Sequence, residues 1–263
     1  MLTWLLGPPR GLPSSPWGPV GGVFAVLFAA IFAVVFAGVV MFGIVAVTPA
    51  LRQAVETRCA GGSGECITAL LVTMALVYFF LVAGLIVVCW FKRGATPGNS
   101  LMLRSAQWRG WQYLVFAVAT VGSLIVLQQI IFWASDQLAI APVDPSADLE
   151  QMRQYLNFEE PATLIVMGVL AVILAPMAEE FVFRGMLFAA FQKTIGVIGS
   201  AILLSALWSV LHWGYSSQNL LALFLLGLLF AYIVWRTGSL WPAIVGHTAN
   251  NFVAVVALLT SQA

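Results

Sequence analysis

The segment ATLIVMGVLAVILAPMAEEFVFRGMLFAAF, residues 162–191, decides the fold of this chain. It is almost wholly apolar, and it exceeds the roughly 20 residues that a helix needs to cross the hydrocarbon core of a membrane. Glu179, Glu180 and Arg184 nevertheless interrupt it. A charge at mid-bilayer costs at least about 2.5 kcal/mol, so ionisable residues within such a segment are functional candidates by default.

The composition of the whole chain agrees with a membrane setting. Of its 263 residues, 62% are hydrophobic and only 8% are charged, and the mean hydropathy is +1.01. Soluble domains average about a quarter charged residues, so the composition excludes an ordinary water-soluble globule. The net charge of +1 also argues against a nucleic-acid partner, which would require a basic patch. The lipid bilayer is the expected surrounding.

Apolar runs of spanning length recur along the chain and predict an all-α, polytopic transmembrane helix bundle of about seven spans. The expected spans are residues 20–47, 67–91, 111–133, 162–191, 197–213, 220–235 and 240–259. We expect one membrane-embedded unit. Residues 1–161 form its N-terminal three-span region with an outer loop, and residues 162–263 form a catalytic helical core from the last four spans.

Charges in the loops predict the orientation. With seven spans, one side of the membrane holds seven cationic residues: Arg10, Lys92, Arg93, Arg104, Arg109, Lys193 and Arg236. The other side holds Arg52, Arg58 and Arg153. Lys and Arg are retained in cytoplasmic loops, so we expect a multi-pass protein of the cell membrane with a cytoplasmic N-terminus and an outside C-terminus.

Two cysteines share the short loop RCAGGSGEC on the predicted outer side. Cys59 and Cys66 are separated by a glycine-rich insert that can close on itself. An oxidising compartment permits a disulfide between them, although two free thiols in a tolerant loop fit the sequence equally well.

Helical geometry predicts different roles for the three charged residues in the segment 179–184. Side chains four residues apart are neighbours on a helix, so Glu180 and Arg184 can form an ion pair. Glu179 points about 100° away from Glu180 and is less easily neutralised by the arginine. A carboxylate in a low-dielectric pocket can take a proton from water. Glu179 is therefore the better candidate for a base, with the ion pair as its support.

The chain contains two histidines, and both follow the glutamates in apolar segments. His212 lies in LWSVLHWG and His247 in LWPAIVGHTANN. Asn251 comes four residues after His247 and shares its helix face, where its amide can stabilise an oxyanion. Trp208 comes four residues before His212, where it either walls a pocket or serves as a packing aromatic.

These residues support more than one chemistry. Hydrolysis of an amide needs a water polarised by Glu179 and one histidine, and the other histidine with Asn251 can hold the oxyanion. Alternatively, Glu179, His212 and His247 can ligate Zn²⁺ and leave a position open for water. A proton-coupled membrane transporter and a non-catalytic membrane scaffold or immunity protein would also use buried charges.

Three motifs, in order and spacing, resemble those of the CPBP family, the CAAX prenyl protease and bacteriocin-processing enzymes also called Abi. They are EEFVFR at 179–184, His212 with an aromatic residue four positions earlier, and HTANN at 247–251. The resemblance covers residues 162–259. The second motif of the family usually carries phenylalanine where this chain has Trp208.

The resemblance implies an intramembrane endopeptidase that cuts a membrane-associated protein or peptide, such as a prenylated CAAX substrate or a leader peptide. By this analogy Glu179 activates water with His212, His247 and Asn251 form the oxyanion side, and Glu180 with Arg184 holds the architecture. A glutamate mechanism requires no cofactor, although family members have also been described as metal-dependent.

Overall fold

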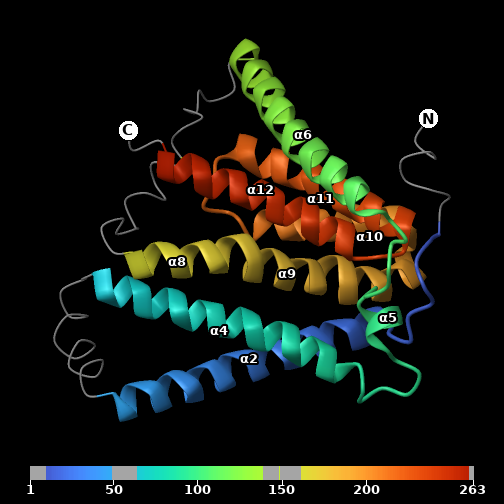
Figure 1. Ribbon diagram of the computed structural model, residues 1–263. Coiled ribbons are helices and arrows are strands. Elements are labelled where there is room, and N and C mark those ends of the chain that lie inside the picture. The colour runs from blue at the N-terminus through green and yellow to red at the C-terminus, as the bar shows by residue number, and fades with distance from the viewer. Residues whose placement is uncertain (1–9, 49–63, 139–147, 149–160, 261–263) are drawn as a thin grey trace.

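The chain forms a bundle of helices in the computed structural model, which describes residues 10–48, 64–138, 148 and 161–260 (Figure 1). The long helices are α2 (Pro19–Val47), α4 (Gly64–Val88), α6 (Gly110–Gln137), α10 (Phe188–Val210), α11 (Ser217–Thr237) and α12 (Trp241–Thr260). Shorter elements are α5 (Pro97–Ser100), α8 (Pro161–Val169), α9 (Ala175–Glu180) and two π-helical segments, η2 (Leu170–Leu174) and η3 (Phe181–Leu187). The described ranges contain no strand, which confirms the all-α prediction.

Six helices in the described residues are long and apolar enough to cross a membrane, whereas the sequence predicts about seven spans. The difference lies in the 50-residue helical stretch Pro161–Val210, which covers two of the expected spans. Gly196 breaks this stretch with φ 71° and ψ 174°, a conformation that is essentially restricted to glycine. Beyond it the chain doubles back. Trp208 hydrogen-bonds Glu179, although a straight helix would separate the two by about 44 Å.

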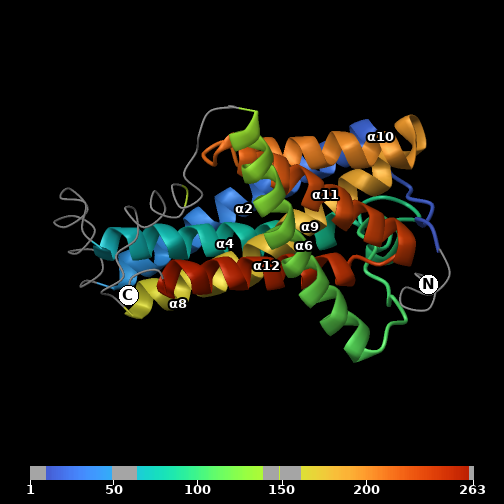
Figure 2. The same cartoon turned by 90° about the horizontal axis from the view of Figure 1, so that it is seen from above.

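The helix that carries the glutamates lies in the middle of the bundle. In Figure 1, α8 and α9 run between α4 on one side and α12 on the other, and α2 lies beyond α4. Figure 2 shows α6 crossing α11 and α12 at a steep angle. This arrangement places the charged residues of the segment among neighbouring helices rather than against lipid.

Small residues let α2 and α4 approach each other closely. The buried positions of α2 recur every three to four residues and are Gly22, Ala25, Ala29, Ala33 and Ala37. Helix pairs in membranes associate through such small side chains because they bring the backbones into van der Waals contact. The N-terminal helices thereby form a wall beside α8 and α9.

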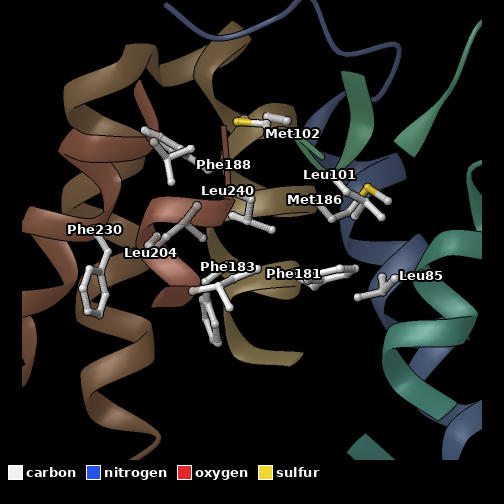
Figure 3. Close-up of a cluster of buried hydrophobic side chains, with 14 of the residues drawn as sticks. Leu85, Leu101, Met102, Phe181, Phe183, Met186, Phe188, Leu204, Phe230 and Leu240 are labelled. Carbon is white, nitrogen blue, oxygen red and sulfur yellow. The ribbon is translucent and has the colours of Figure 1, made fainter. Parts of the chain in front are cut away.

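A cluster of large apolar side chains surrounds the segment that follows the glutamates (Figure 3). Phe181, Phe183 and Met186 of η3 are buried in it. Leu101 and Met102, from the segment after α5, are also fully buried, and the backbone N–H of Leu240 donates to the carbonyl of Met102. The packing fixes η3 from several sides and so fixes the helix turn that carries Glu180.

The predicted disulfide cannot be located in this structure. Cys59 lies outside the described residues, and Cys66 is in the first turn of α4, where its side chain is not described. The third cysteine, Cys89, is a buried free thiol whose Sγ donates to the carbonyl of Leu85.

The reversal at Gly196 predicts a specific cost for a side chain there. Gly196→Ala should lower the free energy of unfolding by about 1–3 kcal/mol, because a Cβ strains this backbone conformation. Thermal unfolding in detergent micelles measures the change. Gly168→Ala is the matched control, since a Cβ there meets nothing within 4 Å and alanine is favoured in a helix. Equal stability of the two variants would contradict the prediction.

Candidate active site

The glutamates lie on a short α-helix between two π-helical segments. At the start of α9, the N–H of Ala175 donates to the carbonyl of Leu170, five residues earlier. Pro176 follows and has no N–H to donate. Beyond Glu180 the chain widens again into η3. Such π-helical turns are rare in proteins overall, but many of those known lie at functional sites. They rotate the side chains that follow relative to a regular helix.

The side chain of Asn251 supplies a hydrogen bond that the backbone of this helix lacks. The carbonyl of Ala171 lacks its usual donors, because the N–H of Ala175 is used by Leu170 and the residue five positions on is Pro176. The side-chain amide of Asn251 donates to this carbonyl at 2.8 Å. A buried carbonyl without a partner costs about 1–3 kcal/mol. Asn251 therefore ties α12 to the helix that carries the glutamates, and its amide has one further N–H.

One carboxylate oxygen of Glu180 accepts hydrogen bonds from two side chains. Its Oε1 accepts a hydrogen bond from Arg184 Nη1 at 2.7 Å and another from His247 Nδ1 at 3.0 Å. The i, i+4 ion pair is thus present as predicted, and both of its side chains are fully buried. Because a carboxylate can only accept, Nδ1 of His247 carries a proton and Nε2 points away from Glu180.

Glu179 faces a different set of partners. Its Oε2 accepts a hydrogen bond from the indole N–H of Trp208 at 2.6 Å and lies 3.9 Å from His247 Nε2. The Glu179 side chain is 18% exposed, whereas that of Glu180 is 0% exposed. The two neighbouring carboxylates therefore differ as the helix geometry predicts. Glu180 is buried in an ion pair, and Glu179 remains partly exposed.

His212 reaches the same place from the end of α10. Its Nδ1 donates to the backbone carbonyl of Trp208 at 2.9 Å, which leaves Nε2 free of this bond. The rings of His212 and His247 lie 5.2 Å and 5.3 Å from the Trp208 ring, both edge to face. The structure therefore brings together all seven residues that the sequence singled out. Among the described residues, His247 is the histidine within 4 Å of a Glu179 oxygen.

A glycine on α11 makes room for the arginine. A Cβ at Gly227 would lie 2.8 Å from Arg184 Nη2 and 2.9 Å from the Cβ of Ser205. Both distances are shorter than real contacts allow, so only glycine permits α11 to approach here. The guanidinium is further held over the rings of Trp208 and Phe230, with centroid distances of 4.5 Å and 5.6 Å.

A chamber of about 550 Å³ opens beside these residues. Trp208, His212, His247, Asn250 and Asn251 are among the residues that line it. Its walls are apolar side chains of α6, α11 and α12, among them Leu124, Leu223, Leu226, Val253 and Leu258. The volume lies in the range of ligand pockets, which are mostly apolar with a few convergent polar groups.

Further polar groups that no sequence motif indicates line the chamber. Tyr215 stacks on His212 with centroids 6.0 Å apart. Burial raises the pKa of the Tyr215 hydroxyl, and the negative charges of Asp148 and Glu179 raise it further, so the hydroxyl keeps its proton. Asp148 accepts hydrogen bonds from Ser216 and Asn219. Asp148 lies 68 residues before Ser216 in the chain, and none of these residues belongs to a motif, so only the fold reveals the group.

The zinc alternative can be compared with this geometry. No group of three His, Cys, Asp or Glu side chains within the described residues is placed to hold a metal ion. Glu179 and His247 approach each other through Oε2 and Nε2. His212 uses Nδ1 on the backbone, so Nε2 is its atom available for a ligand.

Fold and site together define a polytopic membrane protein with a buried carboxylate–histidine centre beside a chamber. Comparison with known proteins adds a family. Residues 161–253 match the family described as type II CAAX prenyl endopeptidase Rce1-like, so this part of the chain is an Rce1-like domain of a peptidase family. The match begins within one residue of the expected core and contains all three motifs.

A curated relative is similar to this chain over a stretch of nearly the same length. The "Putative membrane peptidase YdiL" of Bacillus subtilis (strain 168) is 27% identical over 94 residues, which are 35% of this chain and 38% of that protein. The similarity thus spans well under half of the relative. No solved structure matches the chain significantly.

The contact of Asn251 with Ala171 predicts a coupling with Pro176. Asn251→Ala should lower the free energy of unfolding by about 1 kcal/mol, because it leaves a partly buried carbonyl unpaired. Pro176→Ala restores an N–H near that carbonyl, so the same substitution should cost less in the Pro176→Ala background. A double-mutant cycle from unfolding in micelles measures this difference.

Asn250→Ala is the control for that cycle, because the Asn250 amide donates to Gly246 on its own helix. Its cost should be the same with and without Pro176. If Asn251→Ala also costs the same in both backgrounds, the backbone gap is not what Asn251 fills.

Proposed function

We propose that this chain is an intramembrane endopeptidase that hydrolyses a peptide bond of a membrane-associated protein or peptide with a water activated by Glu179. One observation carries the proposal: Glu179 Oε2 and His247 Nε2 lie 3.9 Å apart. This distance is too long for a direct hydrogen bond, and one water can bond both atoms at about 2.8 Å. The family match to peptidases supports it.

The proposed reaction uses Glu179 as the base. Glu179 takes a proton from the water, and the resulting hydroxide attacks the carbonyl carbon of the substrate. His247 holds the same water through Nε2, because Glu180 fixes its Nδ1 proton. The tetrahedral intermediate then collapses, its C–N bond breaks, and Glu179 returns the proton to the leaving amine.

The oxyanion would be stabilised from the chamber. His212 and Asn251 both line it, and the amide of Asn251 keeps one N–H after its bond to Ala171. By the family analogy, His212 helps Glu179 to activate the water, and His247 with Asn251 stabilises the oxyanion. The approach of His247 to Glu179 supports exchanging these two roles. Glu180 and Arg184 then orient His247 and take no part in proton transfer.

The chamber suggests the class of substrate. Its apolar walls would accommodate a lipid-attached or hydrophobic segment, in keeping with the CAAX prenyl endopeptidases to which residues 161–253 are similar. We therefore propose a prenylated CAAX-type peptide as the first substrate to test, with a hydrophobic leader peptide as the second.

The proposed orientation has a cytoplasmic N-terminus. The backbone N–H of Arg10 donates to Arg236 at the end of α11, and its guanidinium donates to Ser105. Arg10 and Arg236, two of the cations that the sequence groups on one side, therefore lie at the same end of the bundle. Lys and Arg are enriched at the cytoplasmic side of membrane proteins, which supports this orientation.

Peptide cleavage in proteoliposomes tests the proposal. Wild-type protein should cleave a prenylated peptide, and Glu179→Gln should lower kcat by at least about 100-fold, because a general base contributes about 10²–10⁴. Asp136→Asn removes a carboxylate at the exposed end of α6 and should leave the rate unchanged within about twofold. Glu180→Gln should lower both activity and thermal stability, since it leaves Arg184 buried without its partner.

Two results would overturn the proposal. One is the absence of cleavage by wild-type protein for every membrane-associated peptide tested, and the other is equal cleavage by Glu179→Gln. Proton flux across the liposomes that depends on Glu179, without cleavage, would instead identify a transporter.

A further inference from the structure

Trp208 contacts Glu179, Arg184 and both histidines of the candidate site. Its indole N–H donates to Glu179 at 2.6 Å, and Arg184 lies over its ring at 4.5 Å. The two histidines meet its ring edge to face, and its backbone carbonyl accepts the proton of His212 Nδ1. The sequence suggested only an aromatic wall or a packing residue at this position.

We infer that Trp208 is the positioning residue of the base: its indole N–H holds the carboxylate of Glu179 in the orientation that faces His247 and the water. The inference rests on the proposed function and deepens it. The oxygen that accepts the indole N–H is Oε2, the same oxygen that faces His247 Nε2. The bond therefore sets the orientation of the oxygen that approaches the water-binding histidine.

The donor is held rigidly. Trp208 is 1% exposed, and the contacts with Arg184 and with both histidines surround its ring. A preorganised donor loses little conformational entropy when it binds a charge, and a hydrogen bond from a neutral donor to a carboxylate is stronger than one between neutral groups. Trp208 therefore holds Glu179 Oε2 in the position from which it can reach the water.

The N–H and the ring of Trp208 can be separated by substitution. Phenylalanine keeps an aromatic ring for Arg184 and the histidines and cannot donate a hydrogen bond. Leucine removes both features. A role in packing alone predicts that Trp208→Phe behaves nearly as wild type, whereas a role through the N–H predicts a lower kcat with KM nearly unchanged.

The test measures kcat and KM against pH for wild-type protein and Trp208→Phe in proteoliposomes. The kcat profile should fall by about tenfold, because the carboxylate loses the hydrogen bond that orients it. KM should stay within about twofold, since the lost bond acts on the base and not on substrate binding.

The controls separate the N–H from general damage. Trp90→Phe makes the same change at an exposed tryptophan and should leave the profile unmoved. Trp208→Leu should lower the unfolding temperature as well as kcat, because the ring contacts are lost too. A kcat profile of Trp208→Phe that superimposes on that of wild type would overturn the inference.

Infrared spectroscopy distinguishes failure of this inference from failure of the proposed function. The carboxylate stretching band of Glu179, assigned by its loss in Glu179→Gln, should shift in frequency in Trp208→Phe relative to wild type, because the carboxylate loses a hydrogen bond. The measurement needs no cleavage. A moved band in a protein that cleaves nothing would reject the peptidase and retain the Trp208–Glu179 coupling. An unmoved band rejects the coupling, whatever the activity.

Discussion

The buried carboxylate of Glu180 is the interaction on which the rest of the site depends. It has no exposure, and its Oε1 binds both Arg184 and His247. An isolated charge in such a place would be very costly, and removal of one partner from a buried pair typically costs about 3–5 kcal/mol. The two contacts of Glu180 therefore hold three elements together: α9, η3 and α12. Glu179 can remain partly accessible only because its neighbour takes up the arginine.

Helix periodicity was sufficient to predict the division between the two glutamates. The i, i+4 spacing predicted the Glu180–Arg184 ion pair, and the angle between adjacent residues predicted that Glu179 would face elsewhere; both features are present. The catalytic roles stay predictions. Apolar runs likewise predicted a helical membrane bundle, and the order of the motifs predicted the family that residues 161–253 match.

What the sequence could not supply was contact between side chains far apart in the chain. The link from Trp208 to Glu179 depends on the reversal at Gly196, and a glycine in an apolar segment gives no such signal by itself. The bond from Asn251 to Ala171 depends on a π-helical turn before Pro176, which periodicity does not reveal. Tyr215 and Asp148 belong to no motif, so the far end of the chamber becomes visible only in the fold.

The order of the helices along the chain bears on how the protein enters the membrane. Arg184 and Glu180 lie in one helical segment, so they can neutralise each other as that segment is inserted, before any later helix is made. The reversal at Gly196 then brings Trp208 to Glu179 within the same 50-residue stretch. His247 belongs to α12, which follows these elements in the chain. The order of synthesis thus allows the charged residues to pair first, while the centre is completed only when α12 has joined the bundle.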